Sequence, residues 1–205
     1  MSIMGTFPSI FEFRSRCYGT SLWVSPDLFD QAIKNNDWDR NGPRFIANFL
    51  SLGNYPNWLD FPVFFHQITG SSGRKLRDVL DTTFLDFYLI SQRLKDILTS
   101  NGVTGWETYP VRVLDNKENE IHGYHGFSVT GRGGEVKYTN DDIFHHKTPE
   151  EVLYDIRQWD GSDIFYILGG GIWMTERVYQ LLKKEKVSAL EDLPSEKFMT
   201  VIDHD

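Results

Sequence analysis

The chain has little cysteine and no long apolar run, and each absence limits where the protein works. A single thiol, Cys17 among 205 residues, cannot form an internal disulfide, which suits a reducing compartment. No stretch approaches the ~18 uninterrupted apolar residues of a membrane-spanning helix. The first residues also lack the basic segment followed by an apolar run that is typical of a secretory signal. We therefore expect a cytoplasmic protein.

Basic residues are also scarce. Lys and Arg number 21 against 29 Asp and Glu, which gives a net charge of −8. A nucleic-acid-binding protein needs a basic face to displace counterions, so this balance disfavours nucleic acid as a partner and permits a basic protein. Apolar residues make up 40% and aromatic residues 15%, which is typical of a folded globule. Because no segment resembles a linker, we expect one domain over residues 1–205.

Acidic residues are concentrated between residues 141 and 163. That segment holds seven acids against Lys147 and Arg157, a net charge of −5. It is either a solvated surface or a surface that binds a basic partner. The candidate partner-binding residues are Asp141, Asp142, Glu150, Glu151 and Asp155.

The most informative feature that is present is an internal repeat. Residues 91–110 and 175–194 align without a gap at an offset of 84, where about one identity is expected by chance. The identical positions are Arg93/Arg177, Leu98/Leu182, Val103/Val187, Glu107/Glu191 and Pro110/Pro194. They fit a capped helix, a tight turn and an extended segment, so we expect repeat units near 87–114 and 171–194. One unit cannot bury its own apolar face, which predicts packing on a common sheet, with an approximate twofold relation as one possibility.

Capping residues and apolar periodicity predict the other elements. Helices are expected after Ser25, Ser91, Thr148 and Thr175, with a short one around residues 76–80. Strands are expected over 61–68, 106–114, 121–129, 164–168 and 198–202, and a turn at Gly131, Gly133 and Gly134. This mixture predicts an α+β fold, with mixed or antiparallel sheets, several helices and a duplicated helix–turn–strand unit.

One segment resembles the start of a calcium-binding loop. Asp37, Asp39 and Asn41 supply alternating oxygen ligands, and the glycine that follows permits a sharp bend. The twelfth position, however, is Asn48, which cannot supply a bidentate carboxylate. An Asx-rich turn explains the same residues, so no metal is assigned.

Other candidate chemistry is also weak. Gly169-Gly170-Gly171 follows a predicted strand, as phosphate-binding loops do, but no lysine-serine or lysine-threonine pair follows, and a flexible turn explains it. His122 and His125 would point to opposite faces of a strand and would chelate a metal poorly. Cys17 has no recognisable nucleophile setting. The sequence therefore predicts no cofactor and no catalytic residue.

The first copy of the repeat resembles a known bacterial family. Residues 87–98, followed by Gly102-Val103-Thr104-Gly105 and Tyr109-Pro110-Val111, are similar to the Myxococcus-type immunity proteins of polymorphic toxin systems. Members carry a serine-capped helix, a turn of this kind and a strand with Tyr-Pro-Val or similar. The resemblance covers about residues 60–195. In the second copy, Lys186 and Ala189 replace the two glycines and Leu190 replaces the tryptophan.

The resemblance implies an immunity protein. Such a protein binds a cognate toxin stoichiometrically and blocks it, with no catalytic turnover. An acidic surface would steer a basic toxin, and aromatic anchors would prolong the complex. The alternative function is a small enzyme or a nucleotide- or phosphate-binding protein that uses Gly169-Gly170-Gly171.

Overall fold

The computed structural model describes residues 9–16, 19–28, 43–55, 57, 59–70, 73–139 and 148–202. The protein is mostly β, with 40% of residues in strands against 21% in helices. The predicted α+β fold with several helices is therefore wrong. In the described ranges the α-helices are α3 (Pro43–Ser51), α4 (Gln92–Ser100) and α5 (Glu176–Lys184), and the single-turn helices are η1 (Pro149–Glu151), η2 (Ile156–Gln158) and η3 (Ser195–Lys197).

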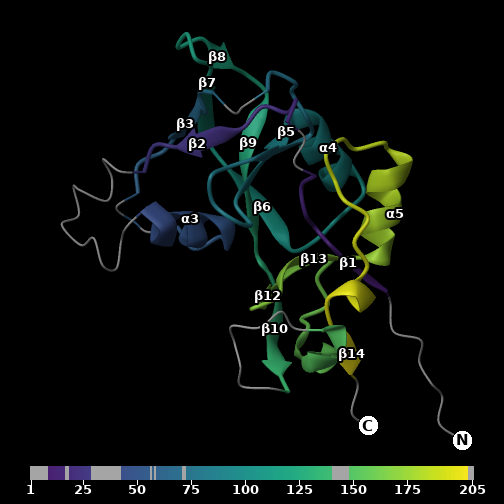
Figure 1. The fold of residues 1–205 in the computed structure, drawn as a ribbon. Helices are drawn as coiled ribbons and strands as arrows, with labels where there is room; N and C mark the ends of the chain where they lie inside the picture. The colour runs from purple at the N-terminus through teal and green to yellow at the C-terminus, as the bar shows by residue number, and fades with distance from the viewer. Residues whose placement is uncertain are drawn as a thin grey trace, which may run out of the picture.

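The strands form three sheets (Figure 1). The largest has the order β1 (Ile10–Glu12), β13 (Gly171–Thr175), β12 (Ile164–Leu168), β10 (Gly131–Tyr138), β11 (Val152–Asp155), β14 (Thr200–Ile202). The second has the order β2 (Val24–Pro26), β3 (Val63–Gln67), β7 (Val111–Leu114), β8 (Glu120–Ile121). The third has the order β4 (Val79–Asp81), β5 (Tyr88–Ser91), β9 (Tyr124–Val129), β6 (Trp106–Tyr109).

Several helix predictions fail because strand pairing overrides local signals. The capping box of Thr148 and Glu151 is present, but it caps only the single turn η1. Val152 and the residues after it then enter β11, which pairs with β10 and β14. Ser25 lies in β2, and most of the helix predicted after it falls outside the described residues. A cap satisfies the first free amide groups of a helix, but it does not decide how far the helix continues.

Two further predictions are wrong for the same reason. The short helix expected around residues 76–80 is replaced by β4, whose Val79 and Leu80 are both buried. The expected turn at Gly131, Gly133 and Gly134 is the start of β10. The strand predicted over 106–114 exists but divides at Pro110 into β6 and β7, which lie in different sheets. Proline has no amide hydrogen for a sheet ladder, which explains the break.

The two copies of the repeat have the same backbone conformation. Ser91 and Thr175 cap α4 and α5 with φ and ψ of −68° and 157° and of −67° and 157°. The turns that follow also match, because Gly102 and Lys186 have φ of 59° and 51°. Gly105 and Ala189, three residues on, have φ of 83° and 73°. The second copy thus keeps a left-handed turn without its glycines.

The repeat extends upstream into a β-hairpin that the ungapped alignment does not show. In the first copy β4 pairs with β5 through Val79↔Ile90, and in the second β12 pairs with β13 through Ile164↔Met174. Strands β5 and β13, which lead into α4 and α5, keep the offset of 84 between the copies. Their hairpin partners Val79 and Ile164, however, are 85 positions apart. The first hairpin therefore has one residue more in its loop.

Each copy takes its third strand from a different part of the chain. In the first copy β9 lies between β5 and β6, with Ser91 paired to Tyr124. In the second copy β1 lies between β13 and the extended segment 189–194, with Thr175 paired to Ile10. We call these assemblies the first unit and the second unit. They belong to different sheets, so the expectation that they pack on a common sheet is wrong.

Asp78 ties the first unit to the second. Its carboxylate accepts hydrogen bonds from the Ser91 cap at 2.9 Å, from Arg93 at 2.9 Å, and from the amide and hydroxyl of Ser188 at 2.8 and 2.9 Å. Arg93 also donates to the carbonyl of Glu185, which ends α5. Burial opposes ionisation of Asp78, but the bonds from Ser188 and Ser91 and the charge of Arg93 outweigh it and hold its pKa below the usual value.

Asp163 makes the reciprocal set of contacts. It accepts from the Thr175 cap at 3.4 Å, from Arg177 at 3.1 Å, and from the amide and hydroxyl of Thr104 at 2.9 and 3.0 Å. Arg177 also donates to the carbonyl of Asn101, which ends α4. Burial again opposes ionisation, and the bonds from Arg177 and Thr104 again lower the pKa of the carboxyl. Each unit thus makes to the other the same contacts that it receives. This reciprocity is expected when two units are related by an approximate twofold axis.

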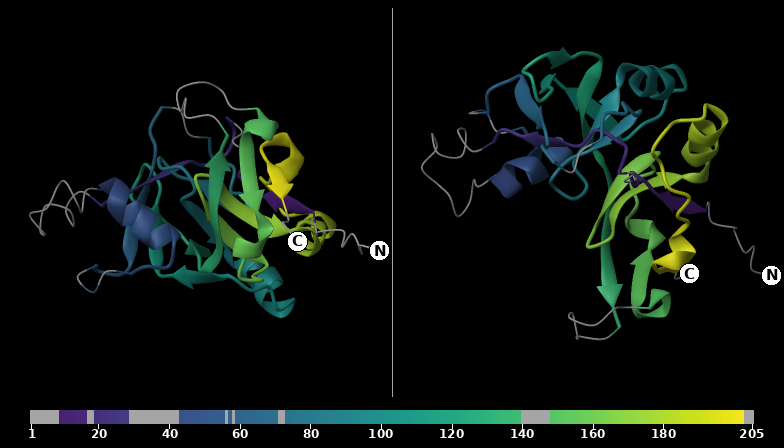
Figure 2. Two further views of the ribbon diagram at one scale, coloured as in Figure 1. Left: turned by 90° about the horizontal axis from the view of Figure 1, so that it is seen from below. Right: turned by 45° about the horizontal axis from the view of Figure 1, so that its top comes forward.

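One of the three hydrophobic core clusters lies between the two units. Helices α4 and α5 run side by side in Figure 1 and in the right view of Figure 2, and their buried leucines and valines share one apolar cluster. Phe13, next to β1, and Phe127, in β9, stack on each other in that cluster with ring centroids 5.1 Å apart. They occupy equivalent places in the two units, three residues after Ile10 and Tyr124.

The left-handed turn of the second unit predicts that a glycine would stabilise it. A side chain at positive φ costs about 1 kcal/mol, and Lys186 is exposed with φ of 51°. We expect Lys186→Gly to raise the free energy of unfolding by about 0.5–1 kcal/mol, measured by urea denaturation. Lys184→Gly, in the last turn of α5, is the control and should lower stability by about 1 kcal/mol. If both variants lost the same free energy of unfolding, the backbone of Lys186 would not be strained at its positive φ.

Candidate functional site

The predicted partner-binding residues are only partly described. Glu150 and Glu151 lie in η1 and Asp155 ends β11, whereas Asp141 and Asp142 fall outside the described residues. Glu151 accepts a hydrogen bond from the amide of Thr148 at 2.8 Å, and Glu150 is exposed.

The acids toward the end of that segment are engaged within the chain. Asp155 forms two hydrogen bonds with the guanidinium of Arg157, at 2.9 and 2.6 Å. Asp160 accepts from the amide of Arg132 at 2.8 Å, and Asp163 holds the two units together. Glu150 is exposed, but hydrogen bonds from its own amide and from the Thr148 side chain lower the pKa of its carboxyl, so it too is engaged within the chain.

The other sequence candidates are not assembled into a site. The calcium candidates Asp37, Asp39 and Asn41 lie outside the described residues. Gly169 and Gly170 form the turn between β12 and β13, and α5 begins only after β13, so these glycines do not lie at a helix N-terminus. Over the ranges that the structure describes, no three His, Cys, Asp or Glu side chains gather as metal ligands would.

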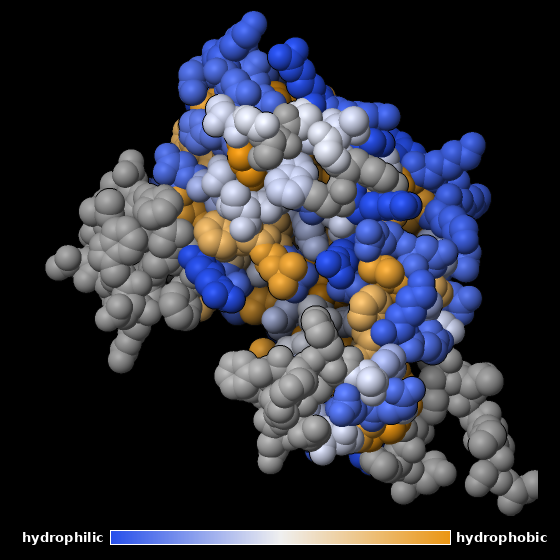
Figure 3. Space-filling view, in the orientation of Figure 1, coloured by the Kyte–Doolittle hydropathy of each residue, from blue (hydrophilic) through white to orange (hydrophobic). Residues whose placement is uncertain are grey.

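A groove lies where the hairpins of the two units meet α3. It has a volume of about 530 Å³. Helix α3 contributes Arg44 and Asn48, the β4–β5 loop contributes residues 83–86, and β12 contributes Tyr166 and Leu168. We call this site the hairpin groove. Figure 3 shows hydrophobic surface in the middle of the same face of the molecule, next to the α3 region, with hydrophilic residues around it.

The hairpin groove has two exposed leucines. Leu85, at the end of the first hairpin, is 80% exposed, and Leu168, at the end of the second, is 58% exposed. A leucine gains free energy when it leaves water, and two of them at one concave site are typical of a protein-binding surface. Both leucines lie near the ends of the equivalent hairpins, and both line the groove.

Three acids that lack enough positive charge lie near one another, and one of them, Asp86, lines the groove. Glu12 in β1, Asp81 in β4 and Asp86 in the groove wall all have a raised pKa, and burial is the main cause for each. For Glu12 the pKa rises to about 6, because the charge of Arg14 only partly offsets burial. The Arg14 guanidinium is 3.9 Å from the Glu12 carboxylate. Glu191 raises the pKa of Glu12 and Asp81 further.

This acid cluster predicts a pH-dependent stability. The Glu12 side chain is 15% exposed, and its Oε2 receives no hydrogen bond from the described residues. Since its pKa is higher in the folded chain, folding binds a proton, and stability falls as pH rises from about 4.5 through 6. We expect Glu12→Gln to be more stable than the wild type by about 1–2 kcal/mol at pH 7.5, as measured by urea denaturation.

The gain should disappear below about pH 4.5, where the wild-type carboxyl is also protonated in both states. Glu196→Gln is the matched control, because Glu196 is exposed in η3, and it should leave stability unchanged at both pH values. A Glu12→Gln variant that is less stable at pH 7.5 would show that Arg14 compensates the carboxylate fully.

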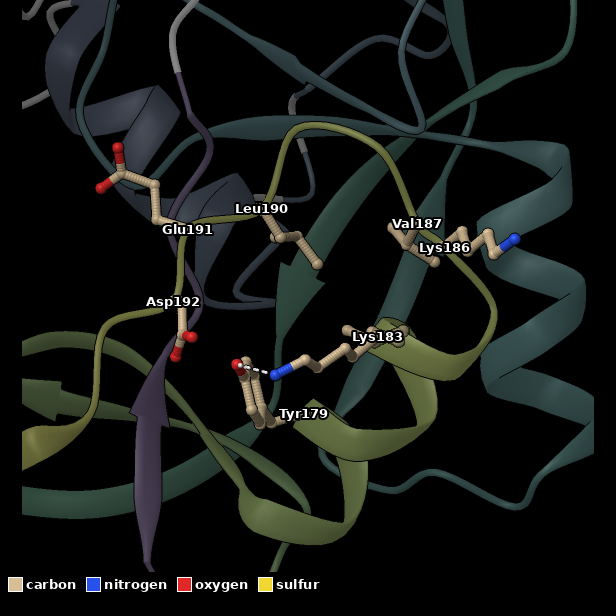
Figure 4. A pocket seen from close by; sticks show the side chains of 8 residues that line it. Tyr179, Lys183, Lys186, Val187, Leu190, Glu191 and Asp192 are labelled. Atoms are coloured by element: carbon tan, nitrogen blue, oxygen red, sulfur yellow. Dashed lines mark hydrogen bonds between the residues drawn. The ribbon is translucent and has the colours of Figure 1, made fainter.

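A second concavity lies at the turn of the second unit. It has a volume of about 240 Å³ and lies between α5 and the extended segment 189–194. Figure 4 shows its side chains, with Leu190 directed toward α5 and Lys183 reaching toward Tyr179. Lys183 donates a hydrogen bond to the Tyr179 hydroxyl at 3.3 Å. We call this site the turn pocket.

Sequence reasoning missed both concavities. The signal for the hairpin groove was Phe84-Leu85, an apolar pair inside a loop between Asp81 and Asp86. The signal for the turn pocket was the replacement of Trp106 by Leu190, the largest loss of side-chain volume between the copies. Neither signal shows a site until the fold is known.

The chain matches no protein-family model and no curated protein sequence. The described residues include no helix that is both long and apolar enough to cross a membrane.

Proposed function

We propose that the chain is an immunity protein, which binds and neutralises a cognate bacterial toxin in the cytoplasm by stoichiometric inhibition. The observation that carries the proposal is the hairpin groove, which is lined by two exposed leucines and by Asp86, an acid whose pKa is raised by burial. The resemblance of residues 60–195 to immunity proteins supplies the biological context. The proposed role needs recognition and no catalytic turnover.

The groove suits a protein partner that has both apolar side chains and a basic group, and its charged lining residues are Asp86 and Arg44. Leu85 and Leu168 supply apolar area, and burying a leucine contributes about 1.5–3 kcal/mol. A Lys or Arg of the partner near Asp86 would supply the positive charge that Arg14 provides only in part. The net charge of −8 also favours fast association with a basic toxin.

We expect the neighbouring gene to encode a toxin, and the test is to co-express its product with this chain. We expect the wild type to restore growth and to purify with the toxin as a 1:1 complex. Leu85→Glu should abolish the rescue, because it places a charge in the apolar contact. Leu76→Glu is the matched control, since Leu76 is 52% exposed but lies outside the groove, and it should rescue fully.

Two outcomes would overturn the proposal. One is the absence of rescue by folded wild-type protein. The other is clear, saturable stabilisation by a nucleotide or by calcium in a thermal-shift assay, since a ligand that binds the folded state raises its stability.

The acidic segment is a separate part of the proposed surface. Charge reversal at Asp141, Asp142, Glu150 and Glu151 should slow association with a basic toxin by about tenfold or more at low salt. An unchanged association rate would remove this segment from the interface and leave the hairpin groove as the proposed site.

A further inference from the structure

The turn of the first unit is closed by an indole. The Trp106 Nε1 donates a hydrogen bond to the carbonyl of Val103 at 2.8 Å, which folds the ring back over the turn. The ring also stacks against Phe127, with centroids 6.3 Å apart. Val103 is only 8% exposed in this arrangement. A tryptophan of the chain itself therefore completes the apolar surface of the first turn.

The second unit has the same turn without the ring. Leu190 occupies the position of Trp106, and the turn pocket opens beside it. Leu182 and Val187, the equivalents of Leu98 and Val103, line the pocket. Val187 is half-buried rather than buried, and no described residue donates a hydrogen bond to its carbonyl. The equivalent acceptor is thus present in the second unit without a donor from the described residues, beside an apolar surface of Val187 and Leu190 that covers the buried Leu182.

We propose that the turn pocket binds an aromatic side chain, a tryptophan, presented by a protein partner. The incoming indole would lie over Leu182, Val187 and Leu190 and donate its N–H to the Val187 carbonyl, as Trp106 does to Val103. Buried tryptophans are among the strongest anchors of protein interfaces. The inference rests on the proposed function only for the identity of the partner as a toxin.

The walls of the pocket are suited to a side chain attached to a peptide. Tyr179 stacks flat on Phe11, with centroids 3.9 Å apart and planes at 4°, so its ring is a fixed wall. Lys183 lies on the helix side of the rim and Asp192 on the side of the extended segment. Charges of opposite sign on the two sides can pair with the carbonyl and amide groups that accompany a partner's tryptophan.

The direct test uses N-acetyl-L-tryptophanamide as the probe, titrated into the isotope-labelled protein and followed by amide NMR shifts. We expect saturable shifts at Lys186, Val187 and Leu190, with a Kd roughly in the millimolar range because the probe is small. N-acetyl-L-alaninamide should cause none. In Leu190→Trp the chain supplies its own ring, so the shifts should disappear while the melting temperature stays equal or rises.

Leu190→Phe is the second variant, because its smaller ring covers less of the floor and should weaken the probe severalfold without loss of fold. The proposal is overturned if the wild type shows no saturable shifts, or if they persist unchanged in folded Leu190→Trp or Leu190→Phe. These results are independent of growth rescue. If the probe binds but growth is not rescued, the turn pocket binds tryptophan and the chain is not an immunity protein for that toxin. If growth is rescued but the probe does not bind, the chain neutralises the toxin without a tryptophan in the turn pocket.

Discussion

Replacing Asp163 with alanine is expected to lower the free energy of unfolding by about 3 kcal/mol, which corresponds to about 6–12 °C in Tm for a chain of this length. The side chain is 14% exposed, and its removal leaves Arg177, the Thr104 amide and the Thr175 hydroxyl without their acceptor. Urea denaturation at pH 7 measures the loss. Asp78→Ala should cost a similar amount, because Asp78 makes the reciprocal contacts.

The double variant distinguishes an interface from two separate sites. Since both carboxylates join the same two units, the combined loss should be smaller than the sum of the single losses. Asp96→Ala is the control, because Asp96 accepts one hydrogen bond from Gln92 on the exposed face of α4, and it should cost less than about 0.5 kcal/mol. Strict additivity would contradict a shared interface.

The same contacts give a pH signature. The pKa of Asp78 and of Asp163 is lowered by folding, so their stabilisation is present above the unfolded value near 4 and is lost as pH falls through the lowered folded value. The difference between the wild type and Asp163→Ala should therefore shrink in strong acid. This direction is opposite to that expected for Glu12.

Replacing either phenylalanine of the central stack with alanine is expected to cost about 3–5 kcal/mol. Phe13 and Phe127 are 0% and 1% exposed, and their rings stack at 5.1 Å on the approximate twofold axis. A double-mutant cycle should give a coupling of about 0.5–1.5 kcal/mol between them. Chemical denaturation of the wild type, the two single variants and the double variant measures the four free energies that the cycle needs.

Phe64→Ala provides the comparison for the stack. Phe64 is 37% exposed and contacts Arg112, with the guanidinium carbon 5.4 Å from the ring centroid. Its loss should cost no more than about 1 kcal/mol. If Phe13→Ala also cost less than 1 kcal/mol, the two units would not share a core.

The sequence predicted the repeat and its local conformation but not its architecture. The N-cap positions of Ser91 and Thr175 and the turns after α4 and α5 follow from local signals, and the structure confirms these positions. Ser91 accepts a hydrogen bond from the Leu94 amide, whereas the Thr175 side chain makes no capping bond. The pairing of β1 with β13 joins residues at opposite ends of the chain, which a local pattern does not encode. The helix predicted after Thr148 was wrong because β10 and β14 pair with the residues that follow it.

The candidate site was hidden for a related reason. Leu85 and Leu168 are far apart in the sequence and line the same groove only in the folded chain. The raised pKa of Glu12 depends on its burial and on the negative charges of Asp86 and Glu191, which come from different units. By contrast, the divergence of the turn at Lys186, Ala189 and Leu190 is visible in the sequence, and the turn pocket lies there.

The most direct test of the proposed function is a calorimetric titration of the purified toxin into the wild type, Leu85→Glu and Leu76→Glu at one pH and salt concentration. We predict 1:1 binding by the wild type and by Leu76→Glu with the same Kd, and a Kd at least about 100-fold weaker for Leu85→Glu, because the apolar contact of the leucine is lost and a charged side chain must be desolvated in its place. Equal affinity of all three folded proteins would contradict recognition through the hairpin groove.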